Sequence, residues 1–180
     1  MIESCCEKKL GFKSSTTTQF ANEIMKLRSQ IYGSKNAENY LALIETYISA
    51  LESLEMFIPK PDETIKKEET VSFTTRMSVS KDQAKSIKTH ISNEKYFVLY
   101  NYAVTVMKEC QDATGDFHTN KFNLKKAASI FNHLADEMPS LLKHDTKPLP
   151  EMKSEHLNGL SYMCIGTVYL MEAVKIYNGT

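Results

Sequence analysis

Apolar residues recur every three or four positions along several long segments of the chain, which is the spacing of one face of an α-helix. The first segment starts at a capping box, Thr16-x-x-Gln19, and continues to Gly33. The second covers residues 37–54, with Ser34 or Asn36 as its N-cap, and prolines at 59 and 61 end it. Because the loop between these segments is short, we expect an antiparallel helical hairpin. Its apolar positions are Phe20, Ile24, Leu27, Ile31, Ala37, Tyr40, Leu41, Ile44, Tyr47, Ile48, Leu51 and Leu54.

The middle of the chain has a different pattern. Residues 60–70 are mostly charged, and Val71, Phe73, Thr75 and Met77 then alternate with polar residues as in a β-strand. A single strand is not stable by itself, so this segment is either a short ribbon lying on the helices or an extended connection. Residues 81–92 have a weak helical pattern.

Two further helices are predicted after the strand-like segment. Residues 94–110 are rich in β-branched and aromatic residues that favour a strand, but the segment is too long for one, so we expect a buried helix. A turn at residues 114–116 then precedes a second helical face, and Pro139 is expected to kink or end that helix. The predicted buried positions are Phe97, Tyr100, Ala103, Val104 and Met107, followed by Leu124, Ala127, Ala128, Phe131, Leu134, Ala135, Met138, Leu141 and Leu142.

The longest periodic segment is residues 149–177, which predicts a helix of about eight turns with Pro150 in its first turn. One stripe is apolar, and a second, made of Gly159, Gly166 and Ala173, contains only small residues. Glycine is tolerated inside a helix at a cost of about 1 kcal/mol. We expect instead that another helix crosses closely over the small stripe, which would make this helix a central one. The apolar stripe is Leu157, Leu160, Cys164, Val168, Met171 and Val174.

Composition is consistent with one globular domain, or a piece of one. The 180 residues are 42% apolar, with 22 basic and 22 acidic residues, and contain few glycines and prolines. Zero net charge gives no general attraction to nucleic acid, so we expect no nucleic-acid partner. No secretory leader is recognised, so the four cysteines are expected to be reduced thiols in a cytoplasmic protein. We expect a loose segment at residues 1–14 and a short tail at 178–180.

The sequence contains no recognisable catalytic motif. Its five histidines have no zinc-site spacing, its cysteines form no Cys-x-x-Cys pair, and its glycines form no phosphate-binding loop. Acidic pairs such as Glu52 with Glu55 are interpreted as solvated charge. We therefore expect no enzyme activity, no catalytic residue, no metal and no cofactor.

Six segments in order resemble a known family. IMKLRSQIYG, LALIETYISALESLEMFIP, VSFTTRM, YFVLYNYAVTVMKE and LKKAASIFNHLADEMPSLL are followed by HLNGLSYMCIGTVYLMEAVKIY. Together they resemble the Bro domain family, of the Alix, rhophilin and Brox type, with Brox most similar. The resemblance covers residues 15–177. It implies an all-α fold, an antiparallel bundle of four to five long helices with the family's tetratricopeptide-like core and at most one short β segment.

Two departures from the family pattern change the expectation. The family usually has Ala-Gln-Ala-Gln-Glu where this chain has Met163 to Thr167, so the polar layer of that helix is lost. The family's domain is also about twice as long, so we expect a partial domain over residues 15–177 that lacks its C-terminal half. A fragment, a short splice form and a degenerate copy are all consistent with that length.

The resemblance implies a non-catalytic adaptor. Its partner would be the C-terminal amphipathic helix of ESCRT-III proteins, the charged multivesicular body proteins, in endosomal sorting or membrane remodelling. The location would be cytoplasmic, at the periphery of endosomes or the nuclear envelope, with membrane contact through partners and self-association through an exposed apolar face. The alternative is a truncated helical module that has lost ESCRT-III binding.

The expected protein-binding residues are Tyr169, Glu172, Ala173 and Ile176. Tyr169 matches a large aromatic position in the family's ESCRT-III-binding patch. Helical phase turns Tyr169 by about 100° from Val168, which belongs to the apolar stripe. Two interpretations remain, since Tyr169 could be a surface anchor for a partner helix or an ordinary buried tyrosine.

Overall fold

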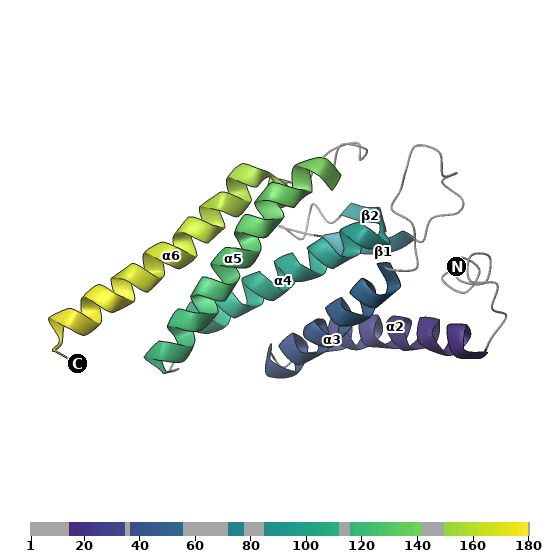
Figure 1. The fold of residues 1–180 in the computed structure, drawn as a ribbon, viewed down its shortest axis with the longest axis horizontal. Helices are drawn as coiled ribbons and strands as arrows, with labels where there is room; N and C mark the ends of the chain where they lie inside the picture. The colour runs from purple at the N-terminus through teal and green to yellow at the C-terminus, as the bar shows by residue number, and fades with distance from the viewer. Residues whose placement is uncertain are drawn as a thin grey trace. The chain divides into compact units, whose positions relative to one another are not determined.

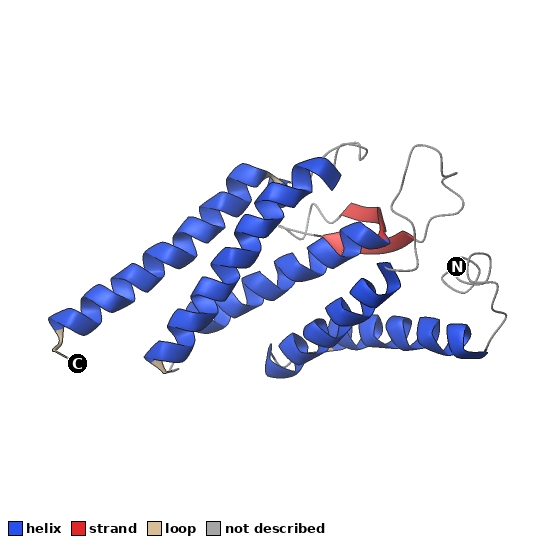
Figure 2. Ribbon diagram, in the orientation of Figure 1, coloured by secondary structure: helices blue, strands red, loops and turns tan. Residues whose placement is uncertain are grey.

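The computed structural model describes residues 15–34, 37–55, 72–77, 85–111, 116–141 and 150–179. The chain divides into two compact units, Met1–Val98 and Leu99–Thr180, and each is described here by itself. The helices and strands are shown in Figures 1 and 2. Predictions for residues 1–14, 60–70, 114–115 and 142 fall outside the described residues, as do both candidate end prolines of the second helix.

The first unit is built on the predicted hairpin. Helix α2 (Ser15–Gly33) contacts helix α3 (Ala37–Glu55), and both predicted segments are confirmed. The helix begins at Ser15, so Thr16 lies in its first turn and is not the N-cap. About half of the predicted apolar positions are buried, and these are Ile24, Ile31, Ile44, Tyr47, Leu51 and Leu54. Five others are only partly buried, namely Phe20, Leu27, Tyr40, Leu41 and Ile48.

The first unit also contains a β-ribbon. Strand β1 (Ser72–Met77) pairs in an antiparallel manner with strand β2 (Lys85–His90), so that Ser72 lies opposite His90 and Met77 opposite Lys85. The extended-connection interpretation is therefore wrong. The helical prediction for residues 81–92 is also wrong over β2, because the weak helical pattern there was outweighed by pairing with a neighbouring strand. Two strands exceed the single β segment expected.

Helix α4 (Ile91–Gln111) contains the boundary between the units, which falls between Val98 and Leu99. The helix prediction for residues 94–110 is confirmed, against the strand propensity of the segment. Phe97 and Ala103 are buried as expected, and Val98, Tyr102 and Val106 are buried as well. The other predicted core positions, Tyr100, Val104 and Met107, are only partly buried.

Helix α5 (Phe117–Leu141) supplies the core of the second unit. Asp116 caps it, because its Oδ2 accepts a hydrogen bond from the Thr119 backbone N–H at 3.1 Å. The helix continues through Pro139 and does not end there. All seven predicted positions from Leu124 to Met138 are buried, which confirms the face as predicted.

The last helix begins later than predicted. Residues Pro150–Met152 form a 3₁₀ turn, η4, and helix α6 covers Ser154–Tyr177. Pro150 therefore starts the 3₁₀ turn and not the α-helix. Met152 is fully buried, so η4 is part of the packed structure. Apart from the ribbon, the described elements are helical, and the all-α class is confirmed (Figure 2).

The small-residue stripe of α6 is not covered in the described part of the chain. Gly159, Gly166 and Ala173 are exposed, and a Cβ placed on either glycine would have no neighbouring atom within 4 Å. The prediction that another helix crosses closely over this stripe, and that α6 is central, is therefore wrong for the described residues. Among the described elements, helix α6 packs along α5 and contacts η4.

Candidate functional site

The buried side of α6 fixes which of its residues are available to a partner. Leu157, Ser161, Cys164 and Val168 are buried, and their spacing of three and four residues places them on one face. Leu160 and Met171 are partly buried, and Val174 is half exposed. The side chains of the predicted apolar stripe are therefore more exposed toward the C-terminal end of α6. The C-terminal half of α6 therefore presents apolar side chains to solvent.

Two hydroxyl groups of α6 bond to the backbone of α5. Ser154 Oγ donates to the carbonyl oxygen of Ala135 at 2.8 Å, and Ser161 Oγ donates to that of Ala128 at 3.1 Å. In a regular helix the Ala135 carbonyl would accept from the N–H of residue 139, which is a proline and has none. Ser154 thus satisfies an acceptor that Pro139 leaves open.

The four predicted binding residues lie together on one exposed side of α6. Tyr169 is 66% exposed and Ile176 is 80% exposed, while Ala173 is exposed and Glu172 is partly buried. At about 100° per residue, all four fall within roughly 100° of helix circumference. The buried interpretation of Tyr169 is therefore wrong, although exposure by itself does not make the residue a binding site.

Lysines from α5 border this surface. Lys121 forms an ion pair with Glu172, and the hydrogen bond from Lys121 lowers the pKa of Glu172, with Lys125 contributing a smaller electrostatic effect. Lys175 Nζ lies 4.6 Å from the ring centroid of Phe117, a cation–π contact between α6 and α5. The surface therefore combines an apolar centre with a basic margin.

Sequence reasoning missed part of this surface. Tyr162 is exposed and Ile165 is partly exposed, seven and four residues before Tyr169, so both lie on the same side. Their helical phase could have identified them. The α5 lysines could not be identified in this way, because their position depends on how the two helices align. We call the surface the Tyr169 face, defined by Tyr162, Ile165, Tyr169, Glu172, Ala173 and Ile176.

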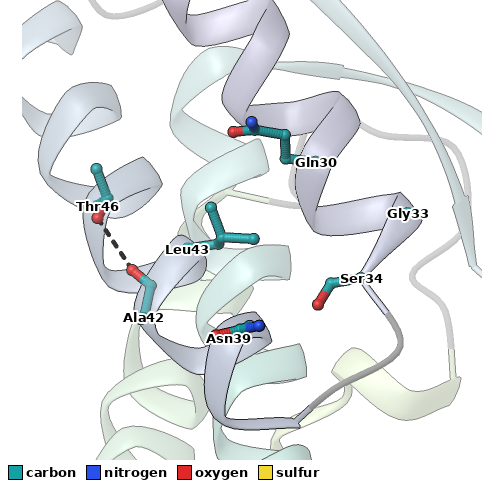
Figure 3. Close-up of a pocket in the computed structure, with 7 residues that line it drawn as sticks. All are labelled: Gln30, Gly33, Ser34, Asn39, Ala42, Leu43 and Thr46. Carbon is teal, nitrogen blue, oxygen red and sulfur yellow. Dashed lines mark hydrogen bonds between the residues drawn. The ribbon is translucent and has the colours of Figure 1, made fainter.

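A concave pocket lies in the first unit. Figure 3 shows it between α2 and α3, and one of its hydroxyls, Thr46 Oγ1, already donates to the Ala42 carbonyl at 3.0 Å. It has no titratable side chain, which gives it no means of acid–base catalysis. Its lining residues are Gln30, Gly33, Ser34, Asn39, Ala42, Leu43 and Thr46.

Titratable groups do not gather into a reactive centre in the described ranges. No cluster of three or more His, Cys, Asp or Glu residues is found there that could hold a metal ion. Burial raises the pKa of the Cys164 thiol to about 11, so that this group stays protonated and weakly nucleophilic at neutral pH. None of the described helices is sufficiently long and apolar to cross a membrane.

Known proteins resemble this chain at the level of family and fold. A solved structure, described as the structural basis for endosomal targeting by the Bro1 domain, matches with a TM-score of 0.71 and 20% identity. The match covers 99% of this chain but 48% of the other, so this chain spans about half of that length. The comparison with curated proteins found no match.

The sequence itself also matches the family model of the BRO1-like domain over residues 2–171. That range contains every element of both units except the last turns of α6. The expected similarity to Brox in particular stays a prediction, as does the division into residues 1–14, 15–177 and 178–180. With both the sequence and the helical architecture in agreement, the chain belongs to the BRO1-like domain family.

Proposed function

We propose that this protein is a non-catalytic adaptor whose Tyr169 face binds the C-terminal amphipathic helix of an ESCRT-III protein in endosomal sorting. The observation that carries the proposal is the exposure of Tyr169 and Ile176 on the side of α6 that the family resemblance indicated. Membership in the BRO1-like family supports a role in protein interaction. An exposed aromatic ring with a polar hydroxyl suits a partner helix, because it offers both apolar area and a hydrogen-bonding tip.

The dimensions of the Tyr169 face agree with a helical ligand. Tyr162 and Ile176 are fourteen residues apart on one side of α6, a length of about 21 Å at about 1.5 Å per residue. A partner helix of about four turns would cover that length with anchors at three- and four-residue spacing. Lys121 and Lys125 on the margin favour a ligand with acidic residues beside its apolar face.

The adaptor is proposed to act in the cytoplasm at the endosome. The solved Bro1 domain is described in terms of endosomal targeting, and we extend that location to this chain as part of the proposal. Neither the structure nor the comparisons favour the nuclear envelope. Membrane contact would follow from partners, since no described helix could span a bilayer.

The test is peptide binding with two matched variants. A fluorescent peptide from an ESCRT-III C-terminal helix is titrated with the full chain and with Tyr169→Asp. We expect Tyr169→Asp to weaken binding about 30-fold or more, as for an interface hot spot of about 2 kcal/mol. The thermal midpoint should change little because Tyr169 is exposed.

Leu170→Asp is the matched control. Leu170 is 64% exposed on the same helix but lies about 100° away from Tyr169, outside the Tyr169 face, so its replacement should leave peptide affinity unchanged. If Tyr169→Asp unfolds the chain or binds the peptide normally, this residue does not belong to the site. If the unmutated chain shows no binding, the alternative of a helical module without ESCRT-III binding is favoured.

A further inference from the structure

The ion pair between Lys121 and Glu172 lies on the α5 side of the Tyr169 face. Glu172 follows Tyr169 by three residues and precedes Ile176 by four, so it lies between the two exposed anchors. Helical phase places Glu172 about 60° from Tyr169 and about 40° from the buried Val168, at the edge nearest to α5. A partner helix that contacts both anchors therefore passes beside the carboxylate of Glu172.

Positive charge exceeds negative charge at this edge. Residues 117–135 of α5 include lysines but no Asp or Glu, and Glu172 is the only acidic residue in the range 156–177. Lys121 pairs with Glu172, while Lys125 is exposed and acts on the same carboxylate through charge alone. Within these two stretches of sequence, the protein thus sets a single carboxylate of its own against a basic edge.

Both partners of the ion pair are accessible to a ligand. The Lys121 side chain is 29% exposed and that of Glu172 is 35% exposed, so solvent reaches each of them. A pair of this kind adds little to stability, because water replaces either partner at small cost. The hydrogen bond from Lys121 lowers the pKa of Glu172, so the carboxylate is charged at neutral pH. The pair is therefore able to open without unfolding the helices that carry it.

A carboxylate from a ligand fits the same lysine. The ligand proposed above carries acidic residues beside its apolar face, and Lys121 is already held at the edge of the Tyr169 face. An ammonium group has three donors, but two carboxylates that share it repel each other. On this basis, which rests on the proposed function, we infer that Glu172 is an internal competitor for the acidic residues of the ligand, and that the pair with Lys121 opens when the ligand binds.

This role makes Glu172 a specificity-determining residue and not an anchor. An acidic ligand gains Lys121 in exchange for Glu172, whereas a neutral ligand leaves the pair closed. A basic ligand could pair with Glu172, but it would be repelled by Lys121 and Lys125. The ion pair therefore favours acidic ligands over basic ones, and it keeps the affinity for acidic ligands moderate.

Peptide titration with Glu172→Gln tests the competition. The probes are the fluorescent ESCRT-III peptide described above and a copy of it in which every Asp and Glu is replaced by its amide. Glutamine keeps the size of Glu172 but forms no ion pair with Lys121, so Glu172→Gln should bind the acidic peptide about two- to fivefold more tightly. The neutral copy should bind both chains equally. Weaker binding of the acidic peptide would make Glu172 an anchor, and either that result or an unchanged affinity overturns the inference.

A double-mutant cycle separates competition for Lys121 from general charge repulsion. Lys121→Met removes the charge and keeps an unbranched side chain, so Glu172→Gln should no longer strengthen binding in that background. Lys125→Met is the matched control, because Lys125 acts on Glu172 through charge alone. There the gain from Glu172→Gln should persist, although the acidic peptide binds more weakly. A gain of equal size in the Lys121→Met background would show repulsion alone and contradict the inference.

NMR titration of the Glu172 carboxyl carbon observes the pair directly. In the free chain the pKa of Glu172 lies below its ordinary value of 4.5 because of Lys121. Saturation with the acidic peptide should raise this pKa to 4.5 or above, since Lys121 then bonds to the ligand, whereas the neutral peptide should leave it lowered. A pKa that stays lowered in the acidic complex would show that the pair remains closed, against the inference.

These outcomes separate the inference from the proposed function. If the acidic peptide binds the unmutated chain but not Tyr169→Asp, and Glu172→Gln brings no gain, the Tyr169 face binds the ligand and Glu172 does not compete for it. If the peptide binds neither the unmutated chain nor Glu172→Gln, both proposals fail. Circular dichroism should be unchanged in the variants at Lys121, Lys125 and Glu172, because all three side chains are at least partly exposed.

Discussion

The two units join their helices with different polar groups. In the first unit, Glu94 of α4 is 1% exposed and its Oε1 accepts hydrogen bonds from Arg28 Nε at 2.9 Å and Tyr47 OH at 3.4 Å. One carboxylate thus connects α2, α3 and α4. In the second unit two uncharged bonds join α6 to α5, since Ser154 and Ser161 donate to backbone carbonyls of α5, and the ion pair of Lys121 with Glu172 lies nearer the surface.

This difference teaches where each unit is sensitive to substitution. A buried charge depends on its partners, and removing one partner leaves the other charge poorly compensated in a medium of low polarity. A hydroxyl–carbonyl bond involves no net charge, so its loss has a smaller effect that depends on whether the carbonyl has another donor. The first unit therefore depends on one fully buried charge, whereas the bonds that Ser154 and Ser161 make in the second unit are uncharged.

The largest effect is expected from Glu94→Ala. Loss of the carboxylate leaves the Arg28 guanidinium, itself mostly buried, without this partner, so we expect the free energy of unfolding to fall by about 3–5 kcal/mol. Urea denaturation followed by circular dichroism measures it. Glu55→Ala is the matched control, because Glu55 bonds to Lys95 at 2.7 Å in a more exposed pair and should cost below about 1 kcal/mol. Equal losses would contradict the comparison.

An intermediate effect is expected from Ser154→Ala, about 1–3 kcal/mol, because the Ala135 carbonyl then loses the donor that replaces the missing N–H of Pro139. Ser161→Ala should cost less, since the Ala128 carbonyl keeps its ordinary helical partner. Pro139→Ala restores an N–H at residue 139. In that background Ser154→Ala should cost clearly less, and a double-mutant cycle that shows no such coupling would refute this explanation.

The smallest effect is expected at the surface pair of Lys121 and Glu172. The pKa of Glu172 is lowered by the hydrogen bond from Lys121, so Lys121→Ala should raise it toward 4.5, as observed by NMR titration of the carboxyl carbon. A lowered carboxyl pKa stabilises the folded state above the unfolded pKa, and this contribution disappears as the pH falls through the folded pKa. At neutral pH we expect almost no change in thermal stability.

Lys125→Ala provides the control for that titration. Lys125 acts on Glu172 through charge alone and is the weaker influence, so its removal should raise the Glu172 pKa less than Lys121→Ala does. An unchanged Glu172 pKa in Lys121→Ala would show that the ion pair does not form in solution. The result would also remove Lys121 from the basic margin of the Tyr169 face.

Sequence periodicity predicted the helices best where a stripe was long and apolar. Every described position from Leu124 to Met138 that was expected to be buried is buried, because that face contacts a neighbour over its whole length. Strand β2 was missed because its residues carry little periodic signal and depend on β1 for hydrogen bonds. The periodicity of one segment does not show that it pairs with the preceding strand.

The candidate site was predicted in part. Helical phase turned Tyr169 away from Val168, and the structure places Tyr169 at the surface. The same reasoning misread Gly159 and Gly166, since a stripe of small residues shows that a close approach is feasible but not that a neighbour is present. The basic margin was missed because Lys121 reaches Glu172 only through the alignment of α5 with α6.

The spacing of the two serine bonds has a mechanical consequence. Ser154 and Ser161 are seven residues apart, and so are their acceptors Ala135 and Ala128. The two bonds therefore join the antiparallel helices at two points with the same separation on each helix. Sliding α6 by one turn would break both bonds at once, so the pair resists shear more than either bond could. The two bonds thereby fix the position of the exposed side chains of α6 along the axis of α5.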